Sequence, residues 1–217
     1  MAAKQPGLSI PVLLEGPYGG VKTRPLTTYD RTLVIACGAG AGFSLPFAMD
    51  WLLDAARRNS VAPQNRGGMS DRKMRVLIST RDADIFDWYE AALLEFLEAN
   101  NLPIELKNVE VLVHLTSGAA VRVQNSPQDS EQGEEKQASV AKENAPRLNI
   151  SALEGRPDIT SAVREMTLET GVTVGLAVCG PAGVLKAAQD AAAEAQLRIL
   201  NSKPGSKEVY LHSEVFS

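Results

Sequence analysis

The chain has 217 residues, a formal net charge of −4 and 44% hydrophobic residues. This length fits one domain with additions and allows a substantial core. Because the net charge is negative and gives no indication of a basic surface, we expect no nucleic-acid partner. Two cysteines and two histidines are too few for a disulfide framework or a multi-histidine metal site, and we expect no metal. Because no segment resembles a signal peptide or a membrane span, we expect a soluble chain in a reducing compartment.

The N-terminal part predicts little regular structure. Residues 1–9 are expected to be loose, Ile10 to Leu14 form a short apolar strand, and a glycine-rich loop follows at 16–20. Pro25 and Tyr29 then lie in a connector.

The stretch from Thr32 to Leu53 predicts a buried strand, a glycine turn and a helix in immediate succession. The strand is Leu33 to Cys37, and Ser44 is a candidate cap for a helix from Pro46 to Arg58. The glycines between them let a ligand approach the backbone, and a helix N-terminus attracts an anion, so a nucleotide phosphate fits here. The alternative is a tight turn without a ligand. A membrane span is disfavoured because glycine, serine and proline interrupt the uncharged run.

Two further strand and helix units follow. Met74 to Ser79 is an apolar strand that ends in Thr80-Arg81-Asp82, and the helix after it has one apolar face. Val109 to Leu115 is the third strand and leads to Thr116. The polar segment at 59–73 predicts a surface loop, and the segment at 119–147 predicts a disordered insertion, because it has almost no large apolar side chains. A linker between two domains is the alternative for the second segment.

The remaining elements complete an alternating pattern. A helix ends near Glu169, Val172 to Val178 is a fourth strand, an alanine-rich helix runs to about Leu200, and Glu208 to His212 is the last strand. Helices between buried strands require right-handed crossovers. The sequence therefore predicts an α/β fold with a doubly wound, parallel, five-stranded sheet.

In such a sheet, the glycine-turn strand and the Cys179 strand lie side by side, and ligands bind in the crevice at their ends. Cys37 and Cys179 are then neighbours, and a disulfide between them is an alternative to two free thiols. Arg81 follows the second strand, where an arginine accepts a 2′-phosphate and favours NADPH. A methyltransferase instead needs a carboxylate at this position, which Asp82 supplies only if the strand ends one residue later.

Six motifs occur along the chain in a fixed order. They are GPYGG at 16–20, CGAGAGFSLPF at 37–47, STRDADIFDWYEAALLEFL from Ser79, GRPDI at 155–159, VCGPAG at 178–183 and LHSEVF at 211–216. In this order they resemble the NADPH-binding domain of ferric reductases and NADPH oxidases, and the SLPF sequence is most similar to the fungal ferric-chelate reductases. The resemblance covers nearly all of the chain outside the N-terminal tail and the two polar loops. It implies a nucleotide-binding domain like that of ferredoxin-NADP reductase.

The resemblance also implies a reaction, in which NADPH gives hydride to FAD and electrons pass singly through membrane haems to ferric iron. It further assigns roles to residues at the matching positions. The pyrophosphate is held by the turn residues Gly38, Ala39, Gly40, Ala41 and Gly42, the 2′-phosphate by Arg81, and the adenosine by Thr116 and Arg156. The nicotinamide lies beside Cys179, Gly180 and Pro181. The family's C-terminal acidic and aromatic pair corresponds to Glu214 and Phe216. The aromatic ring of that pair stacks on the flavin, although here Ser217 follows it. Cys179, Glu214 and Phe216 are thus the candidate catalytic residues.

The chain lacks the flavin-binding signatures and the haem-bearing helices of the family. We therefore expect residues 1–20 to be the end of a flavin-binding domain and residues 21–217 to be the NADPH-binding domain. Its expected partners are the flavin-binding and haem membrane domains of a complete enzyme, on the cytoplasmic side of a plasma membrane. The alternatives are a superoxide-forming NADPH oxidase and a non-catalytic module that binds NADPH. The insertion could carry phosphorylation at Ser126, Ser130 or Ser139.

Overall fold

The computed structural model describes residues 24–60, 72–102, 108–117 and 148–215. The expected strand at 10–14, the loop at 16–20, most of the polar segment at 59–73 and the whole insertion at 119–147 lie outside these ranges. Among the described residues, no helix combines the length and the apolar character that a membrane crossing requires.

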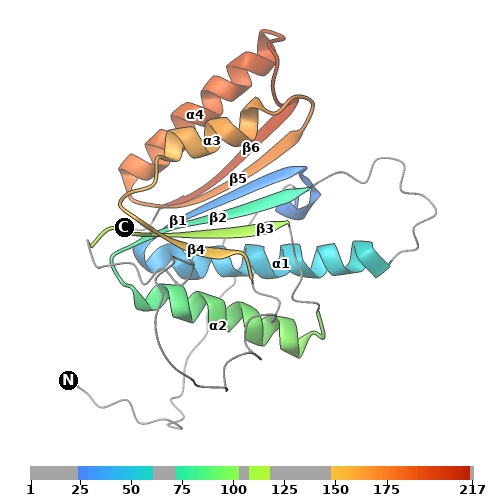
Figure 1. Ribbon diagram of the computed structural model, residues 1–217. Coiled ribbons are helices and arrows are strands. Elements are labelled where there is room, and N and C mark those ends of the chain that lie inside the picture. Colours follow the sequence, from blue (N-terminus) through green and yellow to red (C-terminus); the bar gives the residue numbers. More distant parts are fainter. Residues whose placement is uncertain (1–23, 61–71, 103–107, 118–147, 216–217) are drawn as a thin grey trace, which may run out of the picture.

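The described residues form a six-stranded parallel sheet in the order β4-β3-β2-β1-β5-β6 (Figure 1). The strands are β1 (Arg31–Cys37), β2 (Lys73–Thr80), β3 (Val109–Leu115), β4 (Ile150–Glu154), β5 (Thr173–Gly180) and β6 (Glu208–Val215). The helices are α1 (Ala41–Ser60), α2 (Asp84–Ala99), α3 (Ile159–Leu168) and α4 (Ala182–Leu200). The predicted α/β fold with a doubly wound parallel sheet is therefore confirmed.

Helices cover the sheet on both faces, with α1 and α2 on one face and α3 and α4 on the other (Figure 1). Alternate residues of β1 enter the two cores, so Val34 lies in the α1 and α2 core while Leu33 and Ile35 lie in the other. Burial on both faces explains why the stretch from Leu33 to Cys37 of this strand is continuously apolar. In α4, small side chains allow close packing on the sheet, and Ala188 and Ala191 are buried as expected.

The expected count of five strands was too low by one. β4 joins the edge of the sheet beside β3, but none of its side chains is fully buried. Its five residues, ISALE, therefore lack the apolar run by which the other strands were found. The extra strand lengthens the sheet on the side of β2 and β3 and places the residues after Glu154 beside the end of β3.

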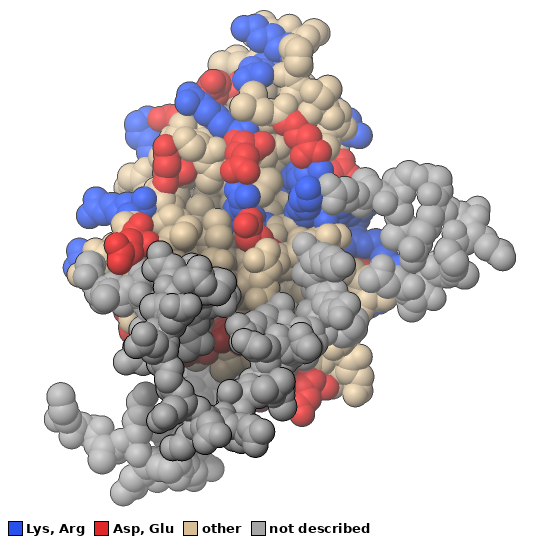
Figure 2. Space-filling model, viewed as in Figure 1, with Lys and Arg blue, Asp and Glu red and all other residues tan. Residues whose placement is uncertain are grey.

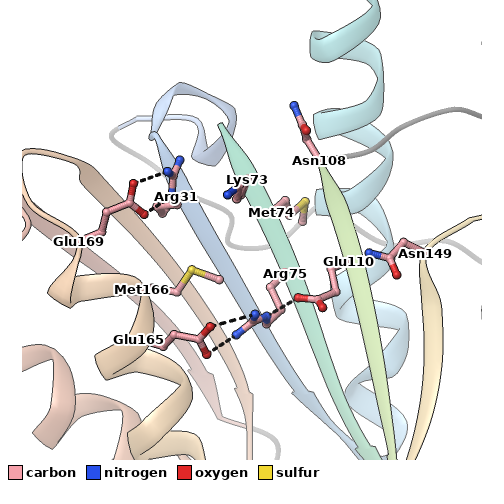
Figure 3. A pocket seen from close by; sticks show the side chains of 10 residues that line it. All are labelled: Arg31, Lys73, Met74, Arg75, Asn108, Glu110, Asn149, Glu165, Met166 and Glu169. Atoms are coloured by element: carbon pink, nitrogen blue, oxygen red, sulfur yellow. Dashed lines mark hydrogen bonds and ion pairs between the residues drawn. The ribbon is translucent and has the colours of Figure 1, made fainter. Parts of the chain in front are cut away.

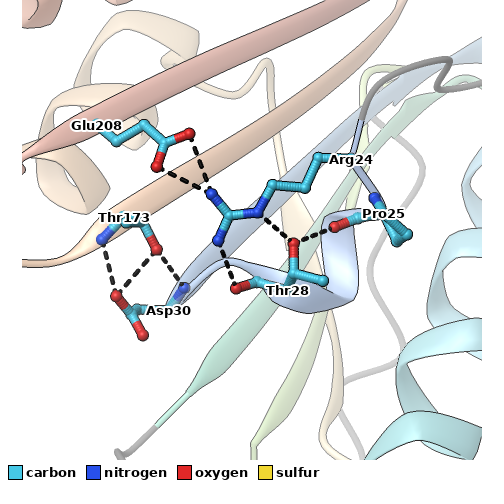
Figure 4. A network of polar contacts seen from close by, with 6 residues as sticks. All are labelled: Arg24, Pro25, Thr28, Asp30, Thr173 and Glu208. Carbon is cyan, nitrogen blue, oxygen red and sulfur yellow. Dashed lines mark hydrogen bonds and ion pairs between the residues drawn. The ribbon is translucent and has the colours of Figure 1, made fainter.

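Polar contacts tie the segment before β1 to the last two strands (Figure 4). The Arg24 guanidinium donates to both Glu208 carboxylate oxygens, at 3.1 and 2.9 Å, and to the Thr28 hydroxyl at 2.7 Å. The Asp30 carboxylate accepts hydrogen bonds from the backbone N–H and the hydroxyl of Thr173, both at 2.9 Å. These contacts lie at the amino ends of β5 and β6, so they brace the sheet at the edge opposite the glycine turn.

Candidate functional site

The candidate site lies at the carboxyl edge of the sheet, between β1 and β5. These strands are paired in parallel, with Ala36 opposite Cys179. The chain leaves β1 toward α1 on one face of the sheet and leaves β5 toward α4 on the other. Their carboxyl ends therefore form the crevice at which doubly wound sheets bind ligands. The predicted adjacency of the two strands is confirmed.

The glycine turn that follows β1 is open on its outer side. Gly38 has a φ of 56°, in the left-handed region that favours glycine. A Cβ atom added at Gly38 or at Gly42 would meet no atom within 4 Å, and both residues are exposed, as is Ala39. A bulky group can therefore approach the backbone from this side.

The inner side of the same turn is packed against β5. Gly40 and Ala41 are buried, and a Cβ atom at Gly40 would lie 3.4 Å from both the carbonyl oxygen and the Sγ of Cys179. The five residues predicted to hold a pyrophosphate thus divide into three that are exposed and two that fix the turn to the sheet.

Helix α1 begins at Ala41, five residues before the predicted start at Pro46. Ser44 is not a cap: its hydroxyl lies inside the helix, donates to the Ala41 carbonyl at 2.7 Å and lies 3.2 Å from the Tyr89 hydroxyl. The glycines themselves form a short 3₁₀ turn that leads into α1, so no side-chain cap is needed. As a result, the backbone N–H groups of the helix N-terminus lie in the glycine turn, where an anion is favoured.

The tip of β2 presents a cation. β2 ends at Thr80, one residue beyond the predicted end at Ser79, and Arg81 is the first residue after the strand. Arg81 is exposed and makes no hydrogen bond or ion pair with another described residue. Asp82 has a different role, because its carboxylate accepts the backbone N–H of Asp84 at the start of α2, at 3.0 Å. The strand thus ends one residue later than predicted, as a methyltransferase interpretation of Asp82 required, but this hydrogen bond holds the Asp82 carboxylate to the backbone of α2.

Thr116 and Arg156 follow the next two strands along the same edge. Thr116 donates its backbone N–H and its hydroxyl to the Thr80 carbonyl, at 2.8 and 3.1 Å, so this side chain joins the ends of β2 and β3. Gly155 donates to the Leu115 carbonyl at 2.9 Å and brings the exposed Arg156 to the end of β4. Arg81, Thr116 and Arg156 thus follow three neighbouring strands.

Cys179 is fully buried at the end of β5. Burial, and then the negative charge of Glu214, raise the pKa of its thiol. Burial also raises the pKa of Cys37. Both thiols are therefore held in their neutral, less nucleophilic form.

The two thiols lie on opposite faces of the sheet. Cys179 is opposite Ala36, so by the alternation of strand side chains it shares the α1 face, whereas Cys37 shares the α4 face. Cys37 instead packs over Gly180, where an added Cβ atom would lie 3.2 Å from its Sγ. Both cysteines are free, and the alternative of a disulfide between them does not hold.

Pro181 precedes the first residue of α4, with an extended backbone at φ −65° and ψ 158°. Its ring suits this place because it needs no N–H donor there and fixes the direction in which the chain turns from β5. The predicted Cys-Gly-Pro sequence therefore forms the junction between β5 and α4.

The end of β6 brings an imidazole to the site that sequence reasoning missed. Glu214 is opposite Cys179 in the register of β5 and β6, and its Oε1 lies 3.0 Å from Nε2 of His212. The Phe43 ring, from the first turn of α1, stacks on the imidazole with a centroid distance of 6.5 Å. The two-residue spacing on a strand was the available signal for His212 and Glu214. The other predicted residue of this segment, Phe216, lies outside the described residues.

A hollow of about 380 Å³ lies at the opposite, amino edge of the sheet (Figure 3). Its charges are paired across the fold: Arg75 bridges Glu110 and Glu165, and Arg31 pairs with Glu169. These hydrogen bonds raise the pKa of Arg75 and lower that of Glu165. Positive and negative side chains are likewise interspersed on the described part of the face shown in Figure 2. We read the hollow as a cluster of ion pairs that joins α3 to the sheet, away from the glycine turn.

The comparison with protein families agrees with this geometry. The model of the family described as the ferric reductase NAD binding domain matches residues 29–193. That range begins before β1, contains the glycine turn and the Cys-Gly-Pro junction, and ends within α4. No curated protein matches the chain.

Proposed function

Because the chain belongs to the family of ferric reductase NAD binding domains, we propose that it binds NADPH and delivers hydride to FAD in a ferric-chelate reductase. In this proposal, electrons then pass through membrane haem to ferric iron. The flavin and the haem are held mainly by other domains of the complete enzyme, which are its proposed partners on the cytoplasmic side of a plasma membrane. Membership of the family supports the binding of a nicotinamide nucleotide and the assignment to the oxidoreductases. The preference for NADPH and the identity of the acceptors are the proposed part.

The glycine turn fits a dinucleotide. The exposed backbone at Gly38, Ala39 and Gly42 has open space above it and leads into the N-terminus of α1. These residues, with Gly40 and Ala41 beneath them, would hold the pyrophosphate through backbone N–H groups and the helix dipole. No side chain of the turn stands in the way.

The single observation that favours NADPH over NADH is the arrangement at the tip of β2. Arg81 is exposed there without a partner among the described residues, while the Asp82 carboxylate is bonded to the backbone of α2. An arginine at this position pairs with a 2′-phosphate, whereas NADH needs a carboxylate that accepts from the ribose hydroxyl. Arg156 and Thr116 would line the adenosine from the neighbouring strands.

The residues at the ends of β5 and β6 would line the nicotinamide end. When bound, NADPH supplies a hydride, which carries two electrons. Gly180 and Pro181 would shape this part of the crevice, and Glu214 would present a carboxylate there. Because Gly40 covers the Cys179 thiol, direct contact of Cys179 with a nicotinamide requires a shift of the glycine turn. Phe216 keeps its proposed role of stacking on the flavin.

Calorimetric titration of the purified chain with NADPH and with NADH tests the nucleotide part of the proposal. We expect saturable binding of NADPH that is at least about tenfold tighter than binding of NADH, as a charge-assisted contact to a phosphate supplies. Mixing the NADPH-loaded chain with a flavin-binding domain from the same family should then bleach the flavin absorbance. Equal affinities for the two nucleotides would remove the preference for NADPH, and binding without flavin reduction would favour a non-catalytic module.

A further inference from the structure

His212 and Glu214 form a pair on one face of β6. They are separated by one residue, so their side chains point to the same side of the sheet. Nε2 of His212 lies 3.0 Å from Oε1 of Glu214, which is the distance of a direct hydrogen bond. A carboxylate only accepts, so the proton of this contact is on Nε2 of the imidazole.

Aromatic contacts restrict the His212 ring. The Phe43 ring lies nearly parallel to the imidazole, at an interplanar angle of 14°, and the Phe47 ring meets Phe43 edge-on at 5.0 Å. Phe43 belongs to the first turn of α1, directly after the glycine turn. The His212 side chain is 17% exposed and that of Glu214 is 39% exposed. The imidazole is thus held from its face and through Nε2, while the carboxylate remains accessible.

The carboxylate in turn acts on the end of β5. Glu214 is opposite Cys179 in the strand register, and its charge contributes to the raised pKa of that thiol, after burial. A chain of contacts therefore runs from α1 through Phe43 and His212 to Glu214, at the crevice between the strands. Without the imidazole, the partly exposed Glu214 side chain would be free to sample several rotamers.

We infer that His212 is a positioning residue, which holds the Glu214 carboxylate toward the nicotinamide end of a bound dinucleotide. The inference rests on the proposed function, because it assigns a second residue to the same crevice. One carboxylate oxygen of Glu214 is occupied by the imidazole, so the other remains for a donor on the ligand. Phe43 makes this arrangement depend on the position of the helix that also forms the glycine turn.

The composition of the chain makes the inference accessible to nuclear magnetic resonance. The chain has two histidines, and the other, His114, lies on β3, which three strands separate from β6. A His114→Gln variant therefore assigns the ring signals of both. We would titrate the chain at fixed pH with NADPH and, separately, with adenosine 2′,5′-bisphosphate, which has the 2′-phosphate but no nicotinamide.

The expected result is that both ligands bind, but only NADPH shifts the ring signals of His212. A His212→Leu variant should lose about threefold to tenfold in NADPH affinity, as the loss of one hydrogen bond predicts, and keep its affinity for the bisphosphate. His212→Gln, which retains a donor, should recover part of the loss. Glu214→Gln should weaken NADPH binding similarly, and adding His212→Leu to it should have little further effect.

The outcomes separate the two proposals. If both ligands bind and His212 neither responds to NADPH nor affects its affinity, the positioning role is overturned while nucleotide binding stands. If a folded chain binds neither ligand, the proposed function fails and the inference fails with it. Equal weakening of both ligands by His212→Leu would assign His212 a structural role in the fold and overturn the inference.

Discussion

Oδ1 of Asp82 lies 3.0 Å from the backbone nitrogen of Asp84 and accepts its N–H. This bond closes the turn between β2 and α2, and the Asp82 backbone N–H is itself bonded to the Thr80 hydroxyl at 3.0 Å. The carboxylate is therefore engaged in local structure, and the side chain at the strand tip that remains available for a ligand is that of Arg81.

Replacing Arg81 by alanine should lower the affinity for NADPH by about tenfold or more, because a charge-assisted contact to the 2′-phosphate is lost. The affinity for NADH, which lacks this phosphate, should not change. Calorimetric titration with each nucleotide measures both effects. Arg57→Ala is the matched control, since Arg57 is an exposed arginine in the last turn of α1. Equal losses of affinity for NADPH and NADH would show that Arg81 does not contact the 2′-phosphate.

Replacing Gly42 by alanine should change the stability of the fold and the affinity for NADPH in opposite directions. Gly42 lies within α1 and an added Cβ atom would meet no neighbour, so alanine should raise the free energy of unfolding by about 0.5–1 kcal/mol. The methyl group would nevertheless occupy the open side of the glycine turn and weaken the binding of NADPH. Thermal unfolding without nucleotide and calorimetry with NADPH measure the two effects.

Alanine at Gly38 is the comparison for this experiment. The space around Gly38 is equally open, but its φ of 56° is unfavourable for a residue with a Cβ atom. This variant should lose about 1–2 kcal/mol in stability and should also bind NADPH more weakly. A stabilised Gly42→Ala variant with unchanged NADPH affinity would argue that the turn is not the binding surface.

Gly175→Ala should destabilise the fold by about 1–3 kcal/mol, because the new methyl group overpacks the core. Its Cβ atom would lie 2.7 Å from Cδ2 of Tyr29 and 2.9 Å from Cδ2 of Leu26. Urea unfolding measures the loss. In a Leu26→Ala background, the same substitution should cost less, since part of the clash is removed, and strict additivity of the two changes would contradict this explanation.

Stability should fall at alkaline pH through Tyr89. Burial raises the pKa of its hydroxyl from 10.0 to about 12, although the bond to Ser44 acts in the opposite direction. Above pH 10 the unfolded chain releases this proton while the folded chain keeps it, so the free energy of unfolding decreases between pH 10 and about pH 12. The slope from this group is at most about 1.4 kcal/mol per pH unit.

A Tyr89→Phe variant isolates that contribution. It should cost about 1 kcal/mol at neutral pH through the lost hydrogen bond, and it should have a shallower decline above pH 10 than the unmodified chain. Chemical unfolding across this range measures both. Parallel declines in the two proteins would exclude Tyr89 as the source. Tyr29, whose pKa is also raised, by burial and by Glu208, contributes equally to both proteins.

The buried strands could be predicted because each carries its own apolar run. Leu33 to Cys37 and Val172 to Val178 are surrounded by core on both faces, so composition alone marked them, and their adjacency followed from the parallel topology. β4 carries no such signal, since its place at the sheet edge exposes its side chains. The predicted start of α1 at Pro46 was wrong, because Ser44 and Pro46 are residues typical of a helix N-terminus. In the structure, the 3₁₀ turn at Gly38–Gly40 leads directly into the helix at Ala41.

The candidate site shows the same division. Arg81 was predicted correctly at the tip of β2, because a residue after a strand end needs no long-range information. The contact between Phe43 and His212 joins elements that are far apart in the chain and depends on where α1 crosses the sheet. The opposite faces of Cys37 and Cys179 likewise depend on the register of β1 against β5, which was not fixed by the sequence of either strand.

The pairing of β1 with β5 has a consequence for how the protein folds. Asp30, just before β1, accepts its hydrogen bonds from Thr173, which lies 143 residues later in the chain. β1, β2 and β3 can pair while the chain is still being synthesised, but β1 acquires its second neighbour only after β5 emerges. Contacts of such long sequence separation form slowly. The crevice that would hold the nucleotide is therefore completed among the last parts of the fold, and a nascent chain that lacks β5 has no site to occupy.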